Sequence, residues 1–341
     1  MQETTKLDTI VNKGLTWINI EKPTRDTMEK WLVSRGYHFH ELDIDDCLSK
    51  IQIPKIDKHN EYIFVVLHFP SSPIHSAAIS AKKKTRKAST TTLHFSQLSV
   101  FAGWNFLVTI HQGDLQPLND LFQQCKQGNS SQKEELMGKT SGYLLHTILD
   151  VLVDDLFHIL MKIVGNLEDI EDAVFDDKVE VVKEISLLRR EITILRRIVS
   201  PLKRIVSAMT RDIQKFSEED LTEYFNDVED HINKVLEVLE TSKETIEIYK
   251  DTDFMLNTEK TNQILAILTI VFSLSIPATI VGTFYGMNVN LPGGLETGPW
   301  TFFGTYTTLI IMSIISAASA LLMYWSFRRV GWVTRSRRNK I

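Results

Sequence analysis

Charged residues are missing from two long stretches near the C-terminal end of this 341-residue chain. No charge occurs between Lys260 and Glu296, and none occurs between Glu296 and Arg328. A membrane-spanning helix needs about 20 mostly apolar residues, and residues 264–284 and 302–327 both meet that requirement. Two core helices of a soluble protein are the alternative, which we disfavour because such helices are usually shorter and carry a polar stripe. The pattern predicts a two-pass membrane protein.

Basic residues flank the second apolar segment on one side only. The tail 328–341 contains six arginine and lysine residues, whereas the connecting stretch 285–301 holds only one charge, that of Glu296. Because basic flanks stay on the cytoplasmic side, we expect the tail in the cytosol. Two passes then place the N-terminal part in the cytosol as well, with the protein in the cytoplasmic membrane.

The net charge is divided unevenly among these parts. The whole chain carries −5, the tail +6 and the loop −1, so residues 1–261 carry −10. An acidic cytosolic body attracts cations, although solubility alone also accounts for many of these carboxylates. The acidity argues against nucleic acid as a partner, and only two cysteines are present, too few for a disulfide scaffold. The chain lacks a phosphate-binding loop, a nucleophile elbow and a hydrolase metal motif, so an enzyme is disfavoured.

The first part of the chain alternates apolar runs typical of strands with short segments typical of helices. We therefore predict a cytosolic α+β domain over residues 1–140. Its expected strands are residues 16–20 and 62–67 and a hairpin of residues 98–101 and 106–110, and its expected helices are residues 25–35, with Thr24 as N-cap, and residues 45–49. Residues 82–87 are almost all basic, which fits either a solvated loop or contact with anionic lipid.

From Gly142 onward the apolar periodicity is helical. Helices are expected over residues 144–170, over residues 179–207 with an interruption at Pro201, and from Ser217, an N-cap followed by acidic residues. No glycine or proline follows until Pro277, so one helix of about 90–100 Å can continue into the first span. A rod that long cannot bury its apolar stripe within one small chain, which implies oligomerisation. The expected stripe consists of Val228, Ile232, Val235, Val238, Leu239 and Ile246. The predicted parts are a helical stalk at 141–261, spans at 262–284 and 302–327, a loop at 285–301 and a tail at 328–341.

The first span ends in the sequence Tyr285-Gly286-Met287-Asn288. Gly286 permits a helix end or a tight turn, and Asn288 offers a neutral amide oxygen at the membrane surface. A helix C-cap would also explain Gly286-Met287-Asn288. The motif is informative mainly because it lies between two predicted spans.

With these landmarks in order, the chain resembles the CorA-type divalent metal transporter family along nearly its whole length. Besides the motif at residues 285–288, the resemblance rests on Thr261-Asn262, Pro277, residues 16–20, Gln52-x-Pro54-Lys55, residues 152–155, Pro201-Leu202 and Tyr224-Phe225-x-Asp227-Val228-x-Asp230-His231. The resemblance implies a homopentamer whose first spans line one pore, beneath a funnel of long helices capped by the α+β domains. Several copies are needed in any case, because two spans cannot enclose a conduit.

The resemblance implies that Gly286, Met287 and Asn288 form a selectivity filter. Mg²⁺ loses water reluctantly, so a ring of Asn288 amides could bind the hydrated ion through its waters. Residues along the first span recur every three to four positions on one helix face, with contact to lipid or to other helices as the alternative for its apolar members. The expected pore-lining residues are Asn262, Leu265, Leu268, Thr269, Phe272, Ile276, Thr279 and Thr283.

The resemblance also implies a regulatory metal between neighbouring cytosolic domains, bound by carboxylates that match Asp46 and Asp227. Mg²⁺ there would lock the subunits closed, and its loss would let them open. Mg²⁺ is thus expected both as the transported and as the regulatory ion, without an organic cofactor. The expected partners are divalent metal ions, further copies of the chain and membrane lipid. Other acidic residues that could share the role are Asp43, Asp45, Glu223 and Asp230.

The loop after the motif departs from the pattern of many magnesium-transporting members. Residues 289–294 read Val-Asn-Leu-Pro-Gly-Gly and lack the acidic residue of the Met-Pro-Glu turn, which is closer to divergent members such as the zinc-transporting ZntB branch. The main prediction is a gated channel for Mg²⁺, with Co²⁺ and Ni²⁺ as other candidate ions. The alternatives are a Zn²⁺ or proton-coupled transporter of the same fold and a membrane-tethered helical scaffold.

Overall fold

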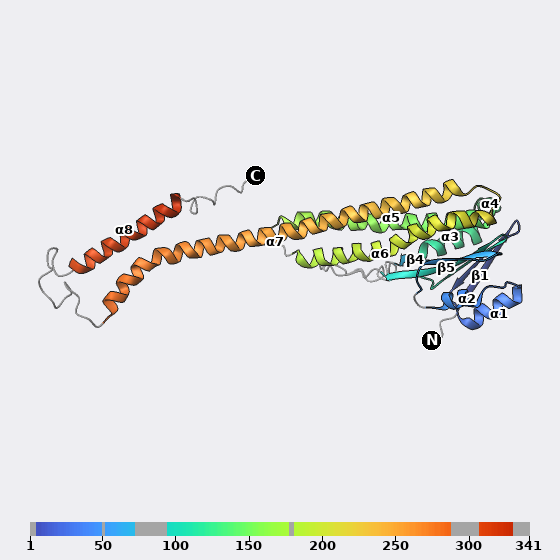
Figure 1. The fold of residues 1–341 in the computed structure, drawn as a ribbon, viewed down its shortest axis with the longest axis horizontal. Helices are drawn as coiled ribbons and strands as arrows, with labels where there is room; N and C mark the ends of the chain where they lie inside the picture. Colours follow the sequence, from blue (N-terminus) through green and yellow to red (C-terminus); the bar gives the residue numbers. More distant parts are fainter. Residues whose placement is uncertain (1–4, 50–51, 72–93, 177–180, 288–306, 330–341) are drawn as a thin grey trace. The chain divides into compact units, whose positions relative to one another are not determined.

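The computed structural model describes residues 5–49, 52–71, 94–176, 181–287 and 307–329. The chain divides into an N-terminal unit, residues 1–251, and a C-terminal unit, residues 252–341. The N-terminal unit contains a β-sheet and the helices that cover it, and the C-terminal unit contains the rest of helix α7 and helix α8 (Figure 1).

The sheet of the N-terminal unit has six strands in the order β1-β2-β6-β5-β4-β3. Strands β2 and β6 are parallel, and every other neighbouring pair is antiparallel. The predicted strands and the hairpin around Gly103 are confirmed as β2, β4 and the pair β5–β6. The bounds are β1 Lys6–Asn12, β2 Leu15–Glu21, β3 Lys55–Lys58, β4 Tyr62–Ser71, β5 His94–Gly103 and β6 Phe106–His111.

Helices α1 (Arg25–Arg35) and α2 (Glu41–Leu48) cover one face of the sheet (Figure 1). Alternate strand residues point to this face, where Phe64 and Phe101 pack in a buried cluster with Met28 of α1. Helix α1 and its cap are confirmed, since Thr24 Oγ1 accepts a hydrogen bond from the Thr27 N–H. The prediction for α2 was wrong at its start, because His40 Nδ1 accepts from the Leu42 N–H and caps the helix four residues earlier. The helix ends at Leu48, one residue before the predicted end.

The opposite face of the sheet is covered by α3 (Gln116–Gln127), by α4 (Ser130–Met137) toward the β1 edge, and by the long helices. Trp17 of β2 meets Phe122 of α3 edge to face, with ring centroids 4.8 Å apart. A buried polar chain extends from Trp17 Nε1 to Thr109 and Asn19 and ends at His111. Because its members satisfy one another, these polar groups can be buried without the cost of unpaired hydrogen bonds.

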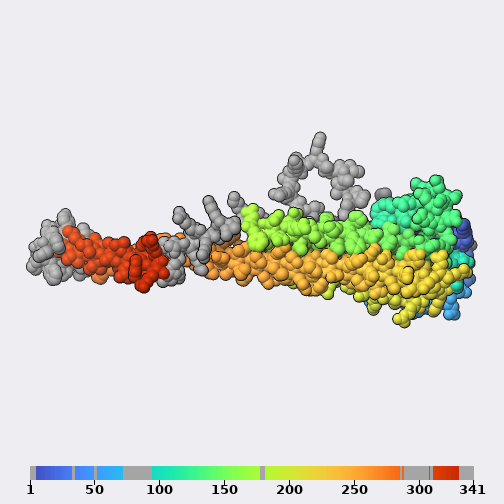
Figure 2. Space-filling view, turned by 90° about the horizontal axis from the view of Figure 1, so that it is seen from above, coloured from blue at the N-terminus to red at the C-terminus, as the bar shows by residue number. Residues whose placement is uncertain are grey.

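Three long helices pack side by side in the N-terminal unit: α5 (Ser141–Val174), α6 (Val182–Ile213) and the first part of α7 (Thr222–Gly286). Ion pairs at 2.7 Å join Arg189 to Glu247 and Arg196 to Glu240, which shows that α6 runs antiparallel to α7. The green surface of α5 lies along the yellow and orange surface of α7 (Figure 2). The predicted interruption at Pro201 is wrong, because α6 continues through it.

Helix α7 begins later than predicted. The Ser217 hydroxyl accepts from the Glu219 N–H and forms a turn after the short 3₁₀ helix η1 (Gln214–Phe216), so Ser217 is not the N-cap. Instead, the Asp220 carboxylate accepts from the N–H of Thr222, the first helical residue. The predicted apolar stripe is confirmed, with Val238 at its half-buried edge, but the expectation that a single chain leaves this stripe exposed is wrong, because it is buried within one copy. The buried apolar residues of α7 in this unit are Phe225, Val228, Ile232, Val235, Leu239 and Ile246.

The C-terminal unit supplies two helices long and apolar enough to cross a membrane. Their most apolar 18-residue windows have mean hydropathies of 2.5 in α7 and 1.8 in α8 (Thr307–Arg329), and at most 6% of either window is buried. Such exposed apolar surface is stable only against lipid or other apolar surfaces. The first part of the second predicted span, residues 302–306, lies outside the described residues.

We expect the buried His111 to make the N-terminal unit acid-sensitive. Its Nδ1 accepts from the Gly113 N–H, so Nε2 donates to Asn19 and the ring is neutral. Burial lowers the pKa of His111 to about 4. In the unfolded chain this histidine has an ordinary pKa of about 6.5. The contribution of the neutral His111 to the free energy of unfolding is therefore fully present above that pH, and up to about 3 kcal/mol is lost as the pH drops toward 4.

The unfolding temperature of the full chain in detergent, measured between pH 7 and 4, checks this expectation. The variant His111→Gln should be less stable at pH 7 and should lose less stability on acidification. The matched variant at the exposed His38, His38→Gln, should follow the wild type. Equal acid sensitivity of His111→Gln and the wild type would contradict the assignment.

Candidate functional site

The predicted pore-lining residues all lie in the C-terminal part of α7. The side chains of Asn262, Leu265, Thr269, Phe272 and Ile276 are exposed, as are those of Leu268, Thr279 and Thr283. Apart from Leu268, which lies beside this row, successive members are three or four residues apart, so they form a stripe along one face of the helix. The stripe presents apolar, amide and hydroxyl groups and no charge.

The hydroxyl groups of this stripe bond to their own helix. Thr269, Thr279 and Thr283 each donate to the backbone carbonyl four residues earlier, at 2.8–3.0 Å. Their protons are therefore occupied, and their oxygen lone pairs face outward as hydrogen-bond acceptors. An outward acceptor suits the water shell of a cation better than it suits an anion.

The signature motif begins at the end of α7. Gly286 is the last helical residue, and the exposed Met287 donates its N–H to the Phe284 carbonyl at 3.4 Å. Asn288, the predicted filter amide, lies outside the described residues, as do the rest of the loop and the basic segment 82–87. The structure thus places two of the three predicted filter residues, Gly286 and Met287, at a helix end.

Asp227, the predicted regulatory ligand on α7, belongs to a cluster of metal-binding side chains. A carboxylate oxygen of Asp150 on α5, one of Asp227 and a ring nitrogen of His231 lie within 4.8 Å of one another. Asp227 and His231 are four residues apart and share a helix face. Asp150 reaches them because α5 packs along α7. Two carboxylates and one imidazole form a ligand set that a divalent cation can use.

The surroundings of this cluster favour a cation. Burial, followed by the charge of Asp154, raises the pKa of Asp150, so its ionised form is destabilised where it stands. Burial lowers the pKa of the neighbouring His146, which favours its neutral form. The Nδ1 atoms of His146 and His231 are buried and accept no hydrogen bond, and His231 Nδ1 is 3.6 Å from the nearest Asp154 oxygen. A bound cation would relieve the repulsion among these carboxylates.

Asp150 and His231 were not predicted as ligands from the sequence. The spacing Asp227-x-x-x-His231 on a helix was a usable signal, because it brings two ligands to one face. Asp150 had no comparable signal, since it is 77 residues away from Asp227 and meets it only through helix packing.

Asp46, the other predicted regulatory ligand, lies in a second cluster. Its carboxylate and those of Asp43 and Asp57 also approach within 4.8 Å. The Lys55 ammonium is 2.5 Å from Asp46 Oδ2 and also pairs with Asp57. Within one chain, Asp46 and Asp227 belong to separate clusters of the N-terminal unit, so a shared metal requires a second copy of the chain.

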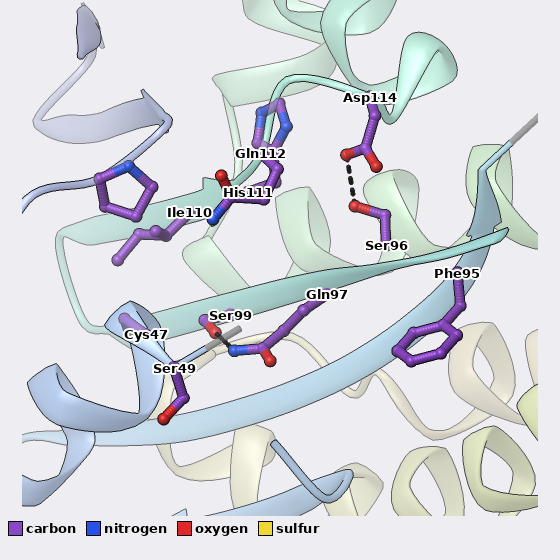
Figure 3. Close-up of a pocket in the computed structure, with 11 residues that line it drawn as sticks. Cys47, Ser49, Phe95, Ser96, Gln97, Ser99, Ile110, His111, Gln112 and Asp114 are labelled. Atoms are coloured by element: carbon purple, nitrogen blue, oxygen red, sulfur yellow. Dashed lines mark hydrogen bonds between the residues drawn. The ribbon is translucent and has the colours of Figure 1, made fainter. Parts of the chain in front are cut away.

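Gln97, which lines a small pocket beside α2, holds the backbone of Asp46 in place. Figure 3 shows the side chain of Gln97 of β5 turned toward Ser99, to which its Nε2 donates at 3.1 Å. The same Nε2 donates to the backbone carbonyl of Asp46 at 2.9 Å, and Gln97 Oε1 accepts from the Gln52 N–H at 3.0 Å. Since these polar atoms are already paired, Gln97 braces α2 against the sheet.

Known proteins resemble this chain over almost its whole length. A family model described as a CorA-like Mg²⁺ transporter protein matches residues 12–329. The chain is 27% identical over 320 residues to the cobalt/magnesium transport protein CorA of Thermotoga maritima, covering 93% of this chain and 83% of that protein.

Solved structures with the same fold include the CorA magnesium transporter of Methanocaldococcus jannaschii, with a TM-score of 0.72 at 21% identity, covering 96% of this chain and 94% of that one. The cytoplasmic domain of ZntB from Vibrio parahaemolyticus matches with a TM-score of 0.54 at 13% identity, covering 72% and 88%. The likeness to ZntB shows a shared fold. The predicted fold class, an α+β domain followed by long helices and two apolar C-terminal helices, is confirmed. Because the family model covers all but the ends of the sequence, this chain belongs to the CorA-like Mg²⁺ transporter family.

Proposed function

We propose that this protein is a homopentameric channel that carries divalent cations, Mg²⁺ above all, across the cytoplasmic membrane. The observation that carries the proposal is the family match over residues 12–329, which includes both apolar helices. The likeness to the cobalt/magnesium transport protein of Thermotoga maritima supports Co²⁺ as a second transported ion. Both termini are proposed to be cytosolic, from the basic residues that follow the second span.

The chemistry of the exposed stripe on α7 supports a conduit for hydrated ions. Neutral amide and hydroxyl oxygens bind the waters around Mg²⁺ without removing them, and the uncharged wall binds weakly enough for release. In a ring of subunits, Asn288 would form the filter, Asn262 and Thr279 further polar stations, and Leu265, Leu268 and Ile276 apolar constrictions. Five copies would also cover apolar surface that a single copy exposes.

The two carboxylate clusters of the N-terminal unit support regulation by cytosolic metal. We propose that Asp46 of one subunit and Asp227 of its neighbour share a divalent cation, with Asp150 and His231 completing the set on the Asp227 side. A cation bridging two subunits holds them together, and its release lets them separate. Because bound ligands must be deprotonated, and burial raises the pKa of Asp150, occupancy should fall as pH is lowered.

We expect Asn288→Ala to abolish Mg²⁺ uptake into liposomes, because the filter loses the amide oxygens that hold the hydrated ion. The uptake rate at a fixed inward Mg²⁺ gradient, measured with an encapsulated indicator, should drop by at least about tenfold. The variant Asn290→Ala, two residues further along the same loop, is the matched control and should retain uptake. Undiminished flux through Asn288→Ala would rule out the filter assignment.

We expect Asp227→Ala to weaken the protection from chymotrypsin that Mg²⁺ gives to the full-length protein. Loss of one carboxylate from the shared site should raise the Mg²⁺ concentration for half-maximal protection by about tenfold or more. Because both residues bind the same ion, the double variant Asp46→Ala, Asp227→Ala should be protected by Mg²⁺ no better than the single variant. Glu244→Gln, which removes an exposed carboxylate elsewhere on α7, should behave as the wild type. Equal protection in Asp227→Ala and wild type would exclude the site.

The ion and the driving force can be settled by one set of flux measurements. A passive channel for Mg²⁺ predicts Mg²⁺ uptake that is unchanged by a pH gradient and exceeds Zn²⁺ uptake at equal gradients. Zn²⁺ uptake that requires an imposed proton gradient would instead support the proton-coupled transporter of the same fold.

A further inference from the structure

Lys55 supplies a built-in cation to the cluster around Asp46. Three carboxylates, those of Asp43, Asp46 and Asp57, converge in a way that a divalent cation could use. The Lys55 ammonium contacts two of them, Asp46 and Asp57. The third, Asp43, is buried and has its own partners, since Tyr62 donates to it at 3.0 Å and His59 Nε2 lies 2.8 Å away.

The register of β3 fixes Lys55 in this place. Lys55 and Asp57 are two residues apart and point to the same face of the sheet, opposite Val66 and Phe64 of β4. That face is the one that α2 covers, so the lysine reaches Asp46 directly. Its ammonium is also 5.6 Å from the centre of the Phe64 ring, within cation–π range.

The Lys55–Asp46 pair is shielded from water, which increases the effect of its charges. The Lys55 side chain is 33% exposed and that of Asp46 is 15% exposed. Burial tends to lower the pKa of Lys55, but hydrogen bonds to Asp46 and Asp57 outweigh this and raise its pKa overall. Gln52 Nε2 donates to the other oxygen of Asp46, so the carboxylate is held on both sides.

We propose that Lys55 competes with the divalent cation for Asp46, and so sets the cytosolic metal concentration at which the regulatory site fills. This inference rests on the proposed role of Asp46 as a metal ligand. An ammonium in contact with a ligand carboxylate lowers its affinity for a second cation, because the two positive charges repel and the carboxylate must be released or shared. The wild-type site therefore fills only at a higher metal concentration than its carboxylates alone would require.

The test is the Mg²⁺ concentration that gives half-maximal protection of the full-length protein from chymotrypsin. Lys55→Gln removes the charge, and we expect the midpoint to fall by about three- to tenfold, as suits a partly buried charge contact. Lys55→Met keeps an unbranched, mostly aliphatic side chain without the charge and should lower the midpoint equally. Lys55→Arg keeps the charge and should leave the midpoint at or above the wild-type value.

Two further variants separate the possible outcomes. Lys30→Gln removes a lysine of α1 that pairs only with the exposed Asp26 in the described structure, and should leave the midpoint unchanged. Asp46→Asn should raise the midpoint if Asp46 binds the metal. A raised midpoint in Asp46→Asn together with a wild-type midpoint in Lys55→Gln and Lys55→Met would overturn the competition alone. A wild-type midpoint in Asp46→Asn would overturn the role of Asp46 in the proposed function, and the competition with it.

Discussion

The structure depends on a sequence of 35 residues, Thr261 to Leu295, that contains no charge. In hydrocarbon, backbone groups cannot bond to water, so the part of this stretch that crosses a membrane must satisfy them within a helix. Helix α7 does this from Thr222 to Gly286 without a break. Its first part is a conventional amphipathic helix, with one buried apolar stripe and charged residues elsewhere. Its last part has no charge on any face, so its apolar surface needs lipid or further copies of the chain to cover it.

The elements that could be predicted from the sequence are those whose burial pattern is local. Strand β4 is a continuous apolar run because both faces of the sheet are covered, and α5 and α7 repeat their apolar residues over many turns. Strands β1 and β3 lie at the two edges of the sheet, where half-exposed residues leave no apolar run. The start of α7 was misplaced because Ser217 caps a separate turn by accepting from the Glu219 N–H. The side chain of Gln214 also accepts from the Leu221 N–H, and residue propensities do not predict these hydrogen bonds.

The site shows the same division between local and long-range information. The stripe on α7 and the pair Asp227 and His231 follow from helix periodicity alone. Asp150 joins them only because α5 and α7 run in the same direction and pack together. Asp150 and Asp227 are 77 residues apart in the sequence, so this contact depends on tertiary packing and could not be predicted from local patterns. Lys55 could not have been assigned to Asp46 from sequence, because the face on which a four-residue edge strand presents its side chains depends on its register with β4.

The two kinds of candidate site differ in chemistry in the way that their proposed tasks require. A conduit must release each ion quickly, which favours neutral oxygens that bind the water shell and disfavours carboxylates, whose charge would hold a divalent cation. A sensor must stay occupied until the free metal concentration falls, which favours carboxylates and an imidazole. Carboxylates alone would keep such a sensor filled at low metal concentration. A lysine contacting one of them weakens the site without removing a ligand, so the threshold can be adjusted by the strength of one ion pair while the geometry of the metal site is preserved.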